Sequence, residues 1–254
     1  MERALETLIE EKRDGVLLIR LNRPRRRNAL SMQLLLELGG LLERAEADEE
    51  VRALVITGNE QAFSAGQDLK EEEPQNYVAT INAVCRQIEA FPKPTIAAIS
   101  GWCIAGGLEL ALCCDFRVCT PDAKIGDWHA KINSIGGAGA TVRLVRLLGI
   151  TKAKELVFTG AAVDGAVAAA VGLVSRVLPE QEVVDGAVSF AKSLCVGSPA
   201  TVQYAKRSLN AAADLSLTEA IDFSLLCQTL VRNSNDASFT AQFAAREGNS
   251  DTSA

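Results

Sequence analysis

The stretch of sequence that decides the fold reads Gly101-Trp102-Cys103-Ile104-Ala105-Gly106-Gly107-Leu108-Glu109-Leu110. Two adjacent glycines open an apolar segment with helical spacing, and the first N–H groups of a helix have no partner inside that helix. These N–H groups and the positive end of the helix dipole suit an oxyanion. Glu109 follows in the first turn, so the stretch predicts a buried helix that carries a carboxylate close to an anion site.

The sequence on either side of this stretch is apolar and broken by turns. Between Lys93 and Asp115 the only charged residue is Glu109. Pro94 and several glycines interrupt the run, so we do not expect a membrane span. A strand, a turn and a buried helix fit better, and a carboxylate buried in such a run is destabilising unless it has a use.

Further outward, strand and helix patterns alternate along the chain. Asp14-Gly15 predicts a turn between the first two strands, and Ser31 is a candidate cap for the first helix. The expected strands are Leu5 to Glu10, Val16 to Leu21, Ala53 to Thr57, Thr95 to Ser100, Asp115 to Cys119 and Leu173 to Leu178. The expected helices follow Ser31 and cover Tyr77 to Ala90, Gly106 to Cys114, Val183 to Cys195, Thr201 to Ala213 and Ala220 to Val231. The pattern predicts an α/β core and, from about Pro199, a helical C-terminal portion.

A second loop combines small residues with a nearby run of positive charge. Residues 62–69 read Ala-Phe-Ser-Ala-Gly-Gln-Asp-Leu and follow a predicted strand and turn. Small side chains let a ligand approach backbone N–H groups. Four arginines within residues 23–27 form the one concentrated basic run of an acidic chain. The pair of features predicts a binding loop with a site for negative charge close by.

The composition limits the class of protein. The 254 residues include 26 basic and 32 acidic side chains, a net charge of −6, so we expect no nucleic-acid or membrane partner. A hydrophobic share of 48% and a charged share of 23% are typical of a folded globular chain. Seven cysteines, with Cys113 and Cys114 adjacent, favour reduced thiols. The first thirty residues lack an apolar signal region, and a cytoplasmic location is expected.

In their order and spacing, these motifs resemble those of the crotonase superfamily, the enoyl-CoA hydratases and isomerases, from about Leu5 to Glu247. The motifs are Asn22-Arg23-Pro24, Phe63 to Leu69, Lys93-Pro94 with Gly101 to Asp115, and Ile135 to Gly139 with Arg143-Leu144. The resemblance implies an α/β fold, a spiral of ββα units, assembled as a homotrimer or a hexamer. Residues 1–198 would form the crotonase-like core and residues 199–254 a helical C-terminal trimerisation region.

The resemblance also implies where an acyl-CoA thioester would lie. The backbone N–H groups of Ala65 and Gly106 would form an oxyanion hole for the thioester oxygen. Coenzyme A is then part of the substrate, and no separate cofactor is expected. Its contacts would be Ala62, Ala65, Gln67, Asp68 and Leu69, with Arg25 and Arg27 near its phosphates. No metal is expected, because the cysteines lack the paired spacing of a zinc site.

At position 129 the chain departs from the family pattern. A hydratase of this family places one carboxylate at Glu109 and a second at position 129, where this chain has His129. Gly136 also stands where a proline is usual. Hydration needs a polarised thioester, an activated water and a proton for Cα. We expect Glu109 to activate the water and His129 to deliver the proton or to hold the water.

The predicted activity is the addition of water across the 2,3 double bond of an enoyl-CoA, with branched or glutaconyl-type acyl groups as candidates. Other interpretations stay open. An isomerase would need Glu109 as its only base, and a scaffold would bind CoA thioesters without turnover. Ser64 with His129 and an aspartate would make a serine hydrolase, although the first glycine of that motif is missing. His129 could also be an exposed residue of an ordinary loop.

Overall fold

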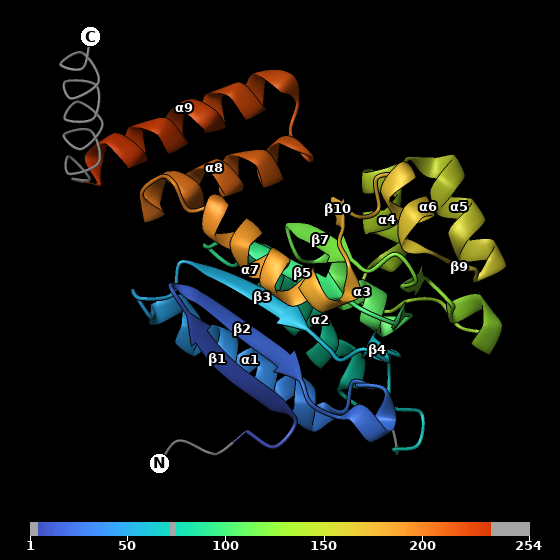
Figure 1. Ribbon diagram of the computed structural model, residues 1–254. Helices are drawn as coiled ribbons and strands as arrows, with labels where there is room; N and C mark the ends of the chain where they lie inside the picture. Colours follow the sequence, from blue (N-terminus) through green and yellow to red (C-terminus); the bar gives the residue numbers. More distant parts are fainter. Residues whose placement is uncertain (1–4, 72–74, 235–254) are drawn as a thin grey trace, which may run out of the picture.

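The computed structural model, which describes residues 5–71 and 75–234, contains two β-sheets (Figure 1). From β3 to β8, consecutive strands alternate between the two sheets. The larger sheet has the order β1-β2-β3-β5-β7-β10, antiparallel between β1 and β2 and parallel elsewhere. Its strands are β1 (Leu8–Arg13), β2 (Val16–Leu21), β3 (Ala53–Thr57), β5 (Thr95–Ile99), β7 (Phe116–Cys119) and β10 (Arg176–Val177). The smaller sheet has the order β4-β6-β8-β9, made of β4 (Ala62–Ser64), β6 (Trp102–Ile104), β8 (Lys124–Gly126) and β9 (Ala162–Val163).

Helices connect the strands and cover the sheets. The α-helices are α1 (Met32–Ala47), α2 (Tyr77–Ala90), α3 (Gly106–Leu112), α4 (Ala140–Leu148), α5 (Ile150–Thr159), α6 (Gly165–Ala170), α7 (Val183–Ser193), α8 (Pro199–Ala212) and α9 (Leu217–Asn233). Three short 3-10 helices are η1 (Pro24–Arg26), η2 (His129–Ile132) and η3 (Glu180–Glu182).

The chain passes three times through the same sequence of elements. The first pass is β3, β4 and α2, the second is β5, β6 and α3, and the third is β7, β8 and, after η2, α4. Each pass adds one strand to each sheet, and the strands of successive passes pair in parallel. This arrangement is the spiral of ββα units that the sequence predicted, followed by a helical C-terminal portion.

The larger sheet is buried on both faces because its side chains alternate between them. In β2, Leu17 and Ile19 belong to the core cluster that α1 and α2 complete. Val16 and Leu18 point to the other face, where they join the cluster that includes side chains of α7. The strands β3 and β5 are buried along their whole length. Two helical layers therefore enclose the sheet, with α7 over one face and α1 and α2 over the other.

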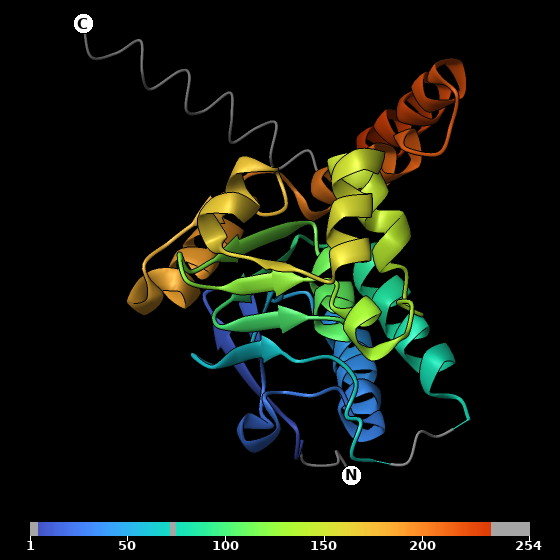
Figure 2. The same cartoon turned by 90° about the vertical axis from the view of Figure 1, so that its right-hand side faces the viewer.

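The last two helices lean away from this body (Figures 1 and 2). None of the side chains described in α8 is buried, and in α9 only Cys227 is. Leu209, Leu217 and Leu225 expose 73%, 78% and 57% of their surface. Hollows of about 940 and 620 Å³, lined in part by α8, separate this pair from the rest of the molecule. The hairpin of α8 and α9 thus presents an apolar surface that residues 5–71 and 75–234 do not cover.

The sequence predictions of single elements held best for long periodic segments. The helix predicted over Tyr77–Ala90 is α2 with the same ends, and the Ser31 hydroxyl caps α1 by accepting a hydrogen bond from the Leu34 N–H at 3.1 Å. The first strand was placed wrongly, at Leu5 to Glu10. Asp14 and Gly15 have φ of 50° and 81°, a tight turn that pairs Arg13 with Val16 and so extends β1 to Arg13.

The strand predicted over Leu173 to Leu178 is reduced to the two residues of β10. The N–H groups of Leu173 and Val174 donate instead to the carbonyl of Ala168, so the end of α6 holds this segment. The sequence analysis also missed α4, α5 and α6 and the short strands of the smaller sheet. A strand of two or three residues is too short to show an alternating pattern, which explains why the strands of the smaller sheet were not predicted.

Candidate active site

The start of α3 lies against the loop after β4, and two glycines make this close approach possible. A Cβ atom at Gly107 would lie 2.3 Å from the carbonyl oxygen of Ser64, a backbone atom that cannot move aside. Gly66 has φ of +88°, and a Cβ atom there would lie 3.0 Å from the N atom of Gly106. Ala105, which precedes α3, has φ of 50° and ψ of −123°, a strained conformation for a residue with a side chain. Strain of this kind is often kept where it serves a site.

Two backbone N–H groups face a common space here. The N atom of Gln67 would lie 3.5 Å from a Cβ atom at Gly106, and neither the Gln67 nor the Gly106 N–H donates to any residue in the described part of the chain. The Ala65 N–H, expected to be the first donor, instead donates to the Arg27 carbonyl at 3.0 Å. The correction from Ala65 to Gln67 follows from the pairing of Leu30 with Gln67, which uses Gly66 O and Asp68 N and leaves Gln67 N pointing the other way.

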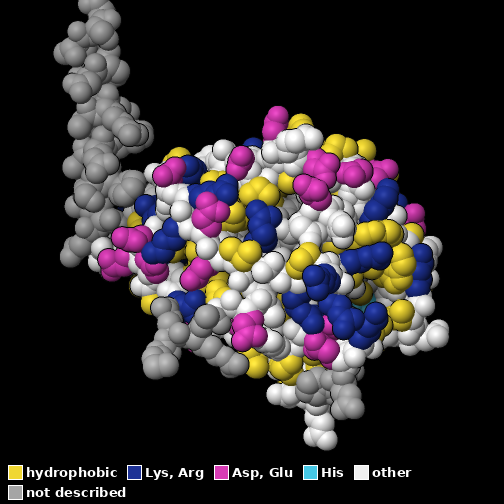
Figure 3. All heavy atoms as spheres, turned by 60° about the horizontal axis from the view of Figure 1, so that its bottom comes forward, with side chains coloured by type: hydrophobic (Ala, Val, Ile, Leu, Met, Phe, Trp, Pro, Cys, Tyr) yellow, Lys and Arg dark blue, Asp and Glu magenta, His cyan; other side chains and the backbone are white. Residues whose placement is uncertain are grey.

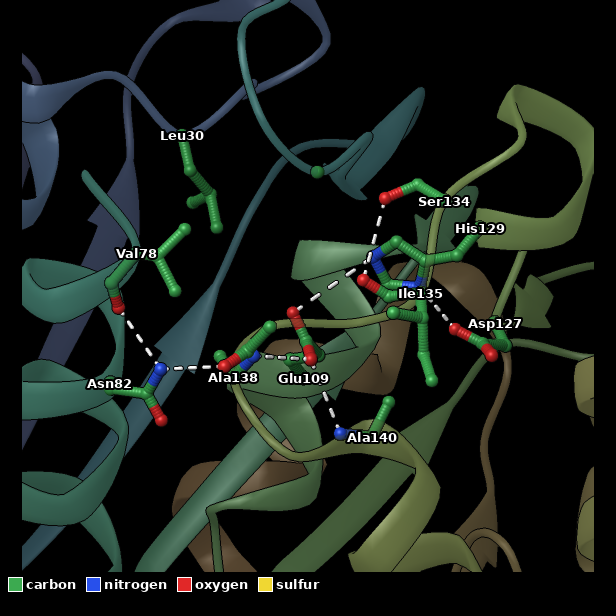
Figure 4. Close-up of polar contacts among 12 residues, drawn as sticks. Leu30, Val78, Asn82, Glu109, Asp127, His129, Ser134, Ile135, Ala138 and Ala140 are labelled. Carbon is green, nitrogen blue, oxygen red and sulfur yellow. Dashed lines mark hydrogen bonds and ion pairs between the residues drawn. The ribbon is translucent and has the colours of Figure 1, made fainter. Parts of the chain in front are cut away.

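Glu109 lies at the bottom of this space, 3% exposed (Figure 4). Its Oε1 accepts hydrogen bonds from the N–H groups of Ala138 and Ala140, at 2.8 and 3.2 Å. Burial raises the pKa of Glu109 above its ordinary value, against the lowering effect of these two donors and of His129. Because both donors hold Oε1, the other oxygen, Oε2, stays available for chemistry.

His129 faces that oxygen, and its Nε2 lies 4.0 Å from Glu109 Oε2. The residue is 8% exposed, so the interpretation of an exposed loop histidine is wrong. Its Nδ1 makes a short hydrogen bond with Asp127 Oδ1 (Figure 4). Burial alone would lower the pKa of His129, but the hydrogen bond to Asp127 and the charges of Asp127 and Glu109 raise it.

The sequence analysis missed Asp127 as part of this site. It is 1% exposed, and it lies two residues before the only histidine of the chain. Trp128 between them has φ of 58°, and the His129 N–H donates to the Asp127 carbonyl at 2.8 Å. A turn of this kind brings both side chains to one side. The available signal was an acidic residue close to an unusual histidine.

Glu109 and His129 open into a cavity of about 310 Å³. Apolar side chains from α2 and from the segment around η2 line much of it, among them Tyr77, Val78, Ile81, Ile132 and Ile135. The loop before α4 is held in place by Asn82, whose amide donates to the Gly137 carbonyl at 2.6 Å (Figure 4). Ser64 is not among the residues that line the cavity, and its Oγ accepts a hydrogen bond from the Gly66 N–H. The structure therefore gives no support to a hydrolase built on Ser64 and His129.

The residues expected to bind coenzyme A have different surroundings. Ala65, Gln67 and Leu69 line the cavity. Ala62 is buried in β4, where its carbonyl accepts hydrogen bonds from Asn28 and Asn59.

Asp68 is also buried, and its Oδ2 lies 2.9 Å from the guanidinium of Arg23 in an ion pair. This ion pair holds the loop against the start of η1, so the Asp68 carboxylate already has a structural partner. Arg25 and Arg27 are exposed on and just after η1. The bond from Ala65 N–H to the Arg27 carbonyl keeps this basic turn beside the loop. Figure 3 shows a surface on which Lys and Arg side chains gather next to hydrophobic ones.

Within residues 5–71 and 75–234, no group of three or more His, Cys, Asp or Glu side chains is placed to hold a metal ion. In the same ranges, no helix is both long enough and apolar enough to cross a membrane. All seven cysteines are free thiols.

Comparison with known proteins agrees with the geometry. The family model described as enoyl-CoA hydratase/isomerase matches residues 11–244. A probable mitochondrial enoyl-CoA hydratase of Dictyostelium discoideum is 38% identical over 221 residues, 85% of this chain and 80% of the relative. The 2,3-dehydroadipyl-CoA hydratase of Escherichia coli (strain K12) is 35% identical over 244 residues, 92% of this chain and 96% of the relative.

Among solved structures, an enoyl-CoA hydratase from Bacillus anthracis superposes with a TM-score of 0.91 at 32% identity. The match covers 95% of this chain and 97% of that one. The family match over most of the chain, the relatives at 35–38% identity and the shared fold lead to one conclusion: the chain belongs to the enoyl-CoA hydratase/isomerase family of the crotonase superfamily.

Proposed function

We propose that this chain adds water across the 2,3 double bond of an enoyl-CoA thioester, with Glu109 and His129 as its acid–base pair. The observation that carries the proposal is the 4.0 Å gap between Glu109 Oε2 and His129 Nε2, inside a cavity edged by two unpaired backbone N–H groups. One water molecule in that gap can hydrogen-bond to both groups, since each bond needs only about 2.8 Å.

The chemistry assigns each group a step. The thioester oxygen accepts hydrogen bonds from the Gln67 and Gly106 N–H groups, which stabilise the negative charge that develops on it. The water oxygen forms a bond to Cβ while Glu109 takes its proton, and the electrons of the double bond move toward the thioester. His129, as an imidazolium, gives its Nε2 proton to Cα. The pKa shifts support these roles, because the raised pKa of His129 favours the charged donor near neutral pH.

The lining of the cavity bears on which acyl group the site can hold. The side chains that line it are mostly apolar, and no Lys or Arg is among them. The E. coli relative is named for a dehydroadipyl-CoA substrate, whose acyl group ends in a second carboxylate. We put a branched, apolar enoyl-CoA first because most side chains that line the cavity are apolar. A carboxylated, glutaconyl-type ester is the second candidate, in line with the name of the E. coli relative.

Further proposals concern coenzyme A and the assembly. Arg25 and Arg27 would lie near the phosphates of coenzyme A, which is bound as part of the substrate, and no other cofactor takes part. Residues 199–254 would join three chains, in a homotrimer or in a hexamer of two such trimers, because α8 and α9 expose apolar side chains. A cytoplasmic compartment would suit the seven free thiols.

The test is a turnover assay over a panel of enoyl-CoA thioesters with linear, branched and carboxylated acyl groups, with product identification. Glu109→Gln should lower hydration by about 10² to 10⁴-fold, because an amide cannot take the proton of water, while calorimetry still detects thioester binding. Glu43→Gln, on the exposed side of α1, is the matched control and should keep full turnover.

Three results would contradict the proposal. Near-normal hydration by Glu109→Gln would remove this carboxylate from the mechanism. Double-bond migration without hydration would make the protein an isomerase. Binding of every thioester without turnover would make it a scaffold.

A further inference from the structure

Gly136 lies where a side chain would collide with the active site. A Cβ atom built there would lie 2.6 Å from Glu109 Oε1, 3.1 Å from His129 Cε1 and 3.3 Å from Ala140 Cβ. Its φ is not in the positive range, so the backbone does not require glycine at this position. The reason for glycine is space, and the space belongs to the Glu109 carboxylate and the His129 ring.

Asp127 fixes the orientation of the same ring. The positive φ of Trp128 folds the chain so that Asp127 Oδ1 meets His129 Nδ1. With Nδ1 engaged, the ring can turn only Nε2 toward Glu109, where the distance to Oε2 is 4.0 Å. A neutral imidazole whose Nδ1 bonds a carboxylate carries its hydrogen on Nδ1, so its Nε2 can accept a proton. The imidazolium that results can release that proton from Nε2.

The burial of Asp127 argues against a purely stabilising role. Asp127 is 1% exposed, and its Oδ2 has no hydrogen-bond partner in the described part of the chain. A buried carboxylate oxygen without a partner destabilises the fold. The residue is therefore better explained by what it does to His129 than by its own contribution to stability.

We propose that Asp127 and Gly136 are the positioning residues that allow an imidazole to work at position 129: Asp127 directs Nε2 toward Glu109, and Gly136 leaves the room that ring and carboxylate share. The inference rests on the proposed hydration chemistry, which needs Nε2 and Glu109 Oε2 on one water. Neither residue needs to touch the substrate. Both act through His129 and Glu109.

Two charged groups face the ring. Asp127 does so from the turn after β8 and Glu109 does so from α3. Lys131, on η2 itself, lies over the Trp128 ring instead, with its Nζ 4.4 Å from the ring centroid. From α4, the Ala140 N–H bonds Glu109 and not the histidine. The protonation of His129 should therefore respond mainly to Asp127 and Glu109.

Because the chain has one histidine, nuclear magnetic resonance of ¹⁵N-labelled imidazole reads His129 alone in the full-length protein without a histidine tag. In the wild type we expect the Nδ1–H tautomer at high pH. Asp127→Asn should lower the pKa of His129, because the amide carries no charge to favour the imidazolium. The wild-type tautomer requires no variant, so the inference stays testable even if Asp127→Asn folds poorly.

Gly136→Ala should displace the Glu109 carboxylate and change the His129 resonances and titration. Gly137→Ala is the matched control in the same loop, because its Cβ atom would meet only the flexible Val78 side chain, at 3.1 Å. We expect Gly136→Ala to lower kcat by about 10²-fold. Gly137→Ala should lower kcat by no more than about 10-fold. Asp127→Asn should lower kcat by about 10-fold or more in the wild-type background. In the His129→Gln background, Asp127→Asn should lower kcat by less than about two-fold.

The outcomes separate this inference from the proposed function. If the enzyme does not hydrate any thioester but His129 responds to Asp127 and Gly136 as described, the hydratase function fails and the positioning stands. An Nε2–H tautomer in the wild type, or a His129 pKa unchanged in Asp127→Asn, would overturn the role of Asp127. Identical resonances in Gly136→Ala and Gly137→Ala would overturn the role of Gly136.

Discussion

At the scale of single residues, the pKa of Glu109 and the pKa of His129 are both raised, but for different reasons. Burial raises the pKa of Glu109, and its bonds to Ala138 and Ala140 oppose the shift. Burial acts on His129 in the opposite direction, and the carboxylate of Asp127 overcomes it. In the proposed mechanism the Glu109 carboxylate acts as a base and the His129 ring acts as an acid. The rate should therefore depend on the protonation state of both groups.

The first prediction is a bell-shaped dependence of kcat/KM on pH. Activity should rise as Glu109 ionises, on a limb above the ordinary glutamate pKa of about 4.3, because its pKa is raised. Activity should fall as His129 loses its proton, on a limb above about 6.5, because its pKa is raised too. His129→Gln, measured by the same assay, should lose the alkaline limb and keep the acid limb. An alkaline limb that persists in His129→Gln would assign it to another group.

At the scale of elements, the distance between α3 and β4 determines whether the two N–H donors can meet one oxygen. Gly107 sets this distance, because its Cα faces the Ser64 carbonyl of β4 with no room for a methyl group. The Gly106 N–H belongs to α3, and the Gln67 N–H belongs to the loop that follows β4. A helix shifted by a fraction of an ångström would separate the donors, and preorganised donors lose much of their effect when displaced.

The second prediction tests this packing. Gly107→Ala should lower the free energy of unfolding by about 1–3 kcal/mol, as overpacking does, and lower kcat/KM as well. Gly40→Ala is the control, since a Cβ atom at Gly40 of α1 meets nothing within 4 Å. It should stabilise the protein by up to about 1 kcal/mol, because alanine is the better helix former. Thermal melting and turnover assays check both variants, and equal effects would refute the argument.

At the scale of the whole molecule, charge and apolar surface are unevenly distributed. The chain has a net charge of −6, yet Arg25, Arg26 and Arg27 are exposed together after Arg23 pairs with Asp68. The hydrophobic residues left exposed are most prominent on α8 and α9. The first feature suits the phosphates of a substrate, and the second suits other copies of the chain.

The third prediction concerns the basic turn. Arg25→Glu should raise KM for an enoyl-CoA about three- to ten-fold and leave kcat unchanged, and the effect should shrink as salt is added. Lys154→Glu on α5 makes the same change in net charge at a distant exposed position and should leave KM as it is. A pantetheine thioester, which lacks the nucleotide phosphates, should not distinguish wild type from Arg25→Glu. Equal KM values with the full CoA ester would rule out Arg25 as a phosphate contact.

The fourth prediction is that the protein in solution has a mass that is a multiple of three chains. Leu217→Glu combined with Leu225→Glu should reduce it to monomers, because buried charges without partners oppose assembly. Leu36→Glu is the control on α1, where the leucine is 61% exposed but lies outside the hairpin of α8 and α9. Light scattering coupled to size exclusion measures the mass. A monomeric wild type would contradict the trimerisation role.

The order of the long periodic elements, and the place of Glu109 in a buried helix that begins with two glycines, could be predicted from the sequence alone. Helices such as α2 repeat a hydrophobic pattern over several turns, and this pattern is a local property that can be read without the fold. The motif around Glu109 can also be interpreted from neighbouring residues alone, since the first N–H groups of a helix are unpaired wherever the helix lies in the fold.

The contacts between these residues became known only from the tertiary structure. The pairing of Leu30 with Gln67 assigned the Ala65 N–H to the Arg27 carbonyl and freed the Gln67 N–H. A single turn at Trp128 buried His129 and gave it Asp127 as a partner, and the space at Gly136 connected both to Glu109. These contacts join residues as far apart in the sequence as Arg27 and Ala65. The hydrogen-bond partner of a backbone group depends on which segment packs against it. The hydrophobic pattern of the sequence does not specify these hydrogen-bond partners, so they could not be predicted without the fold.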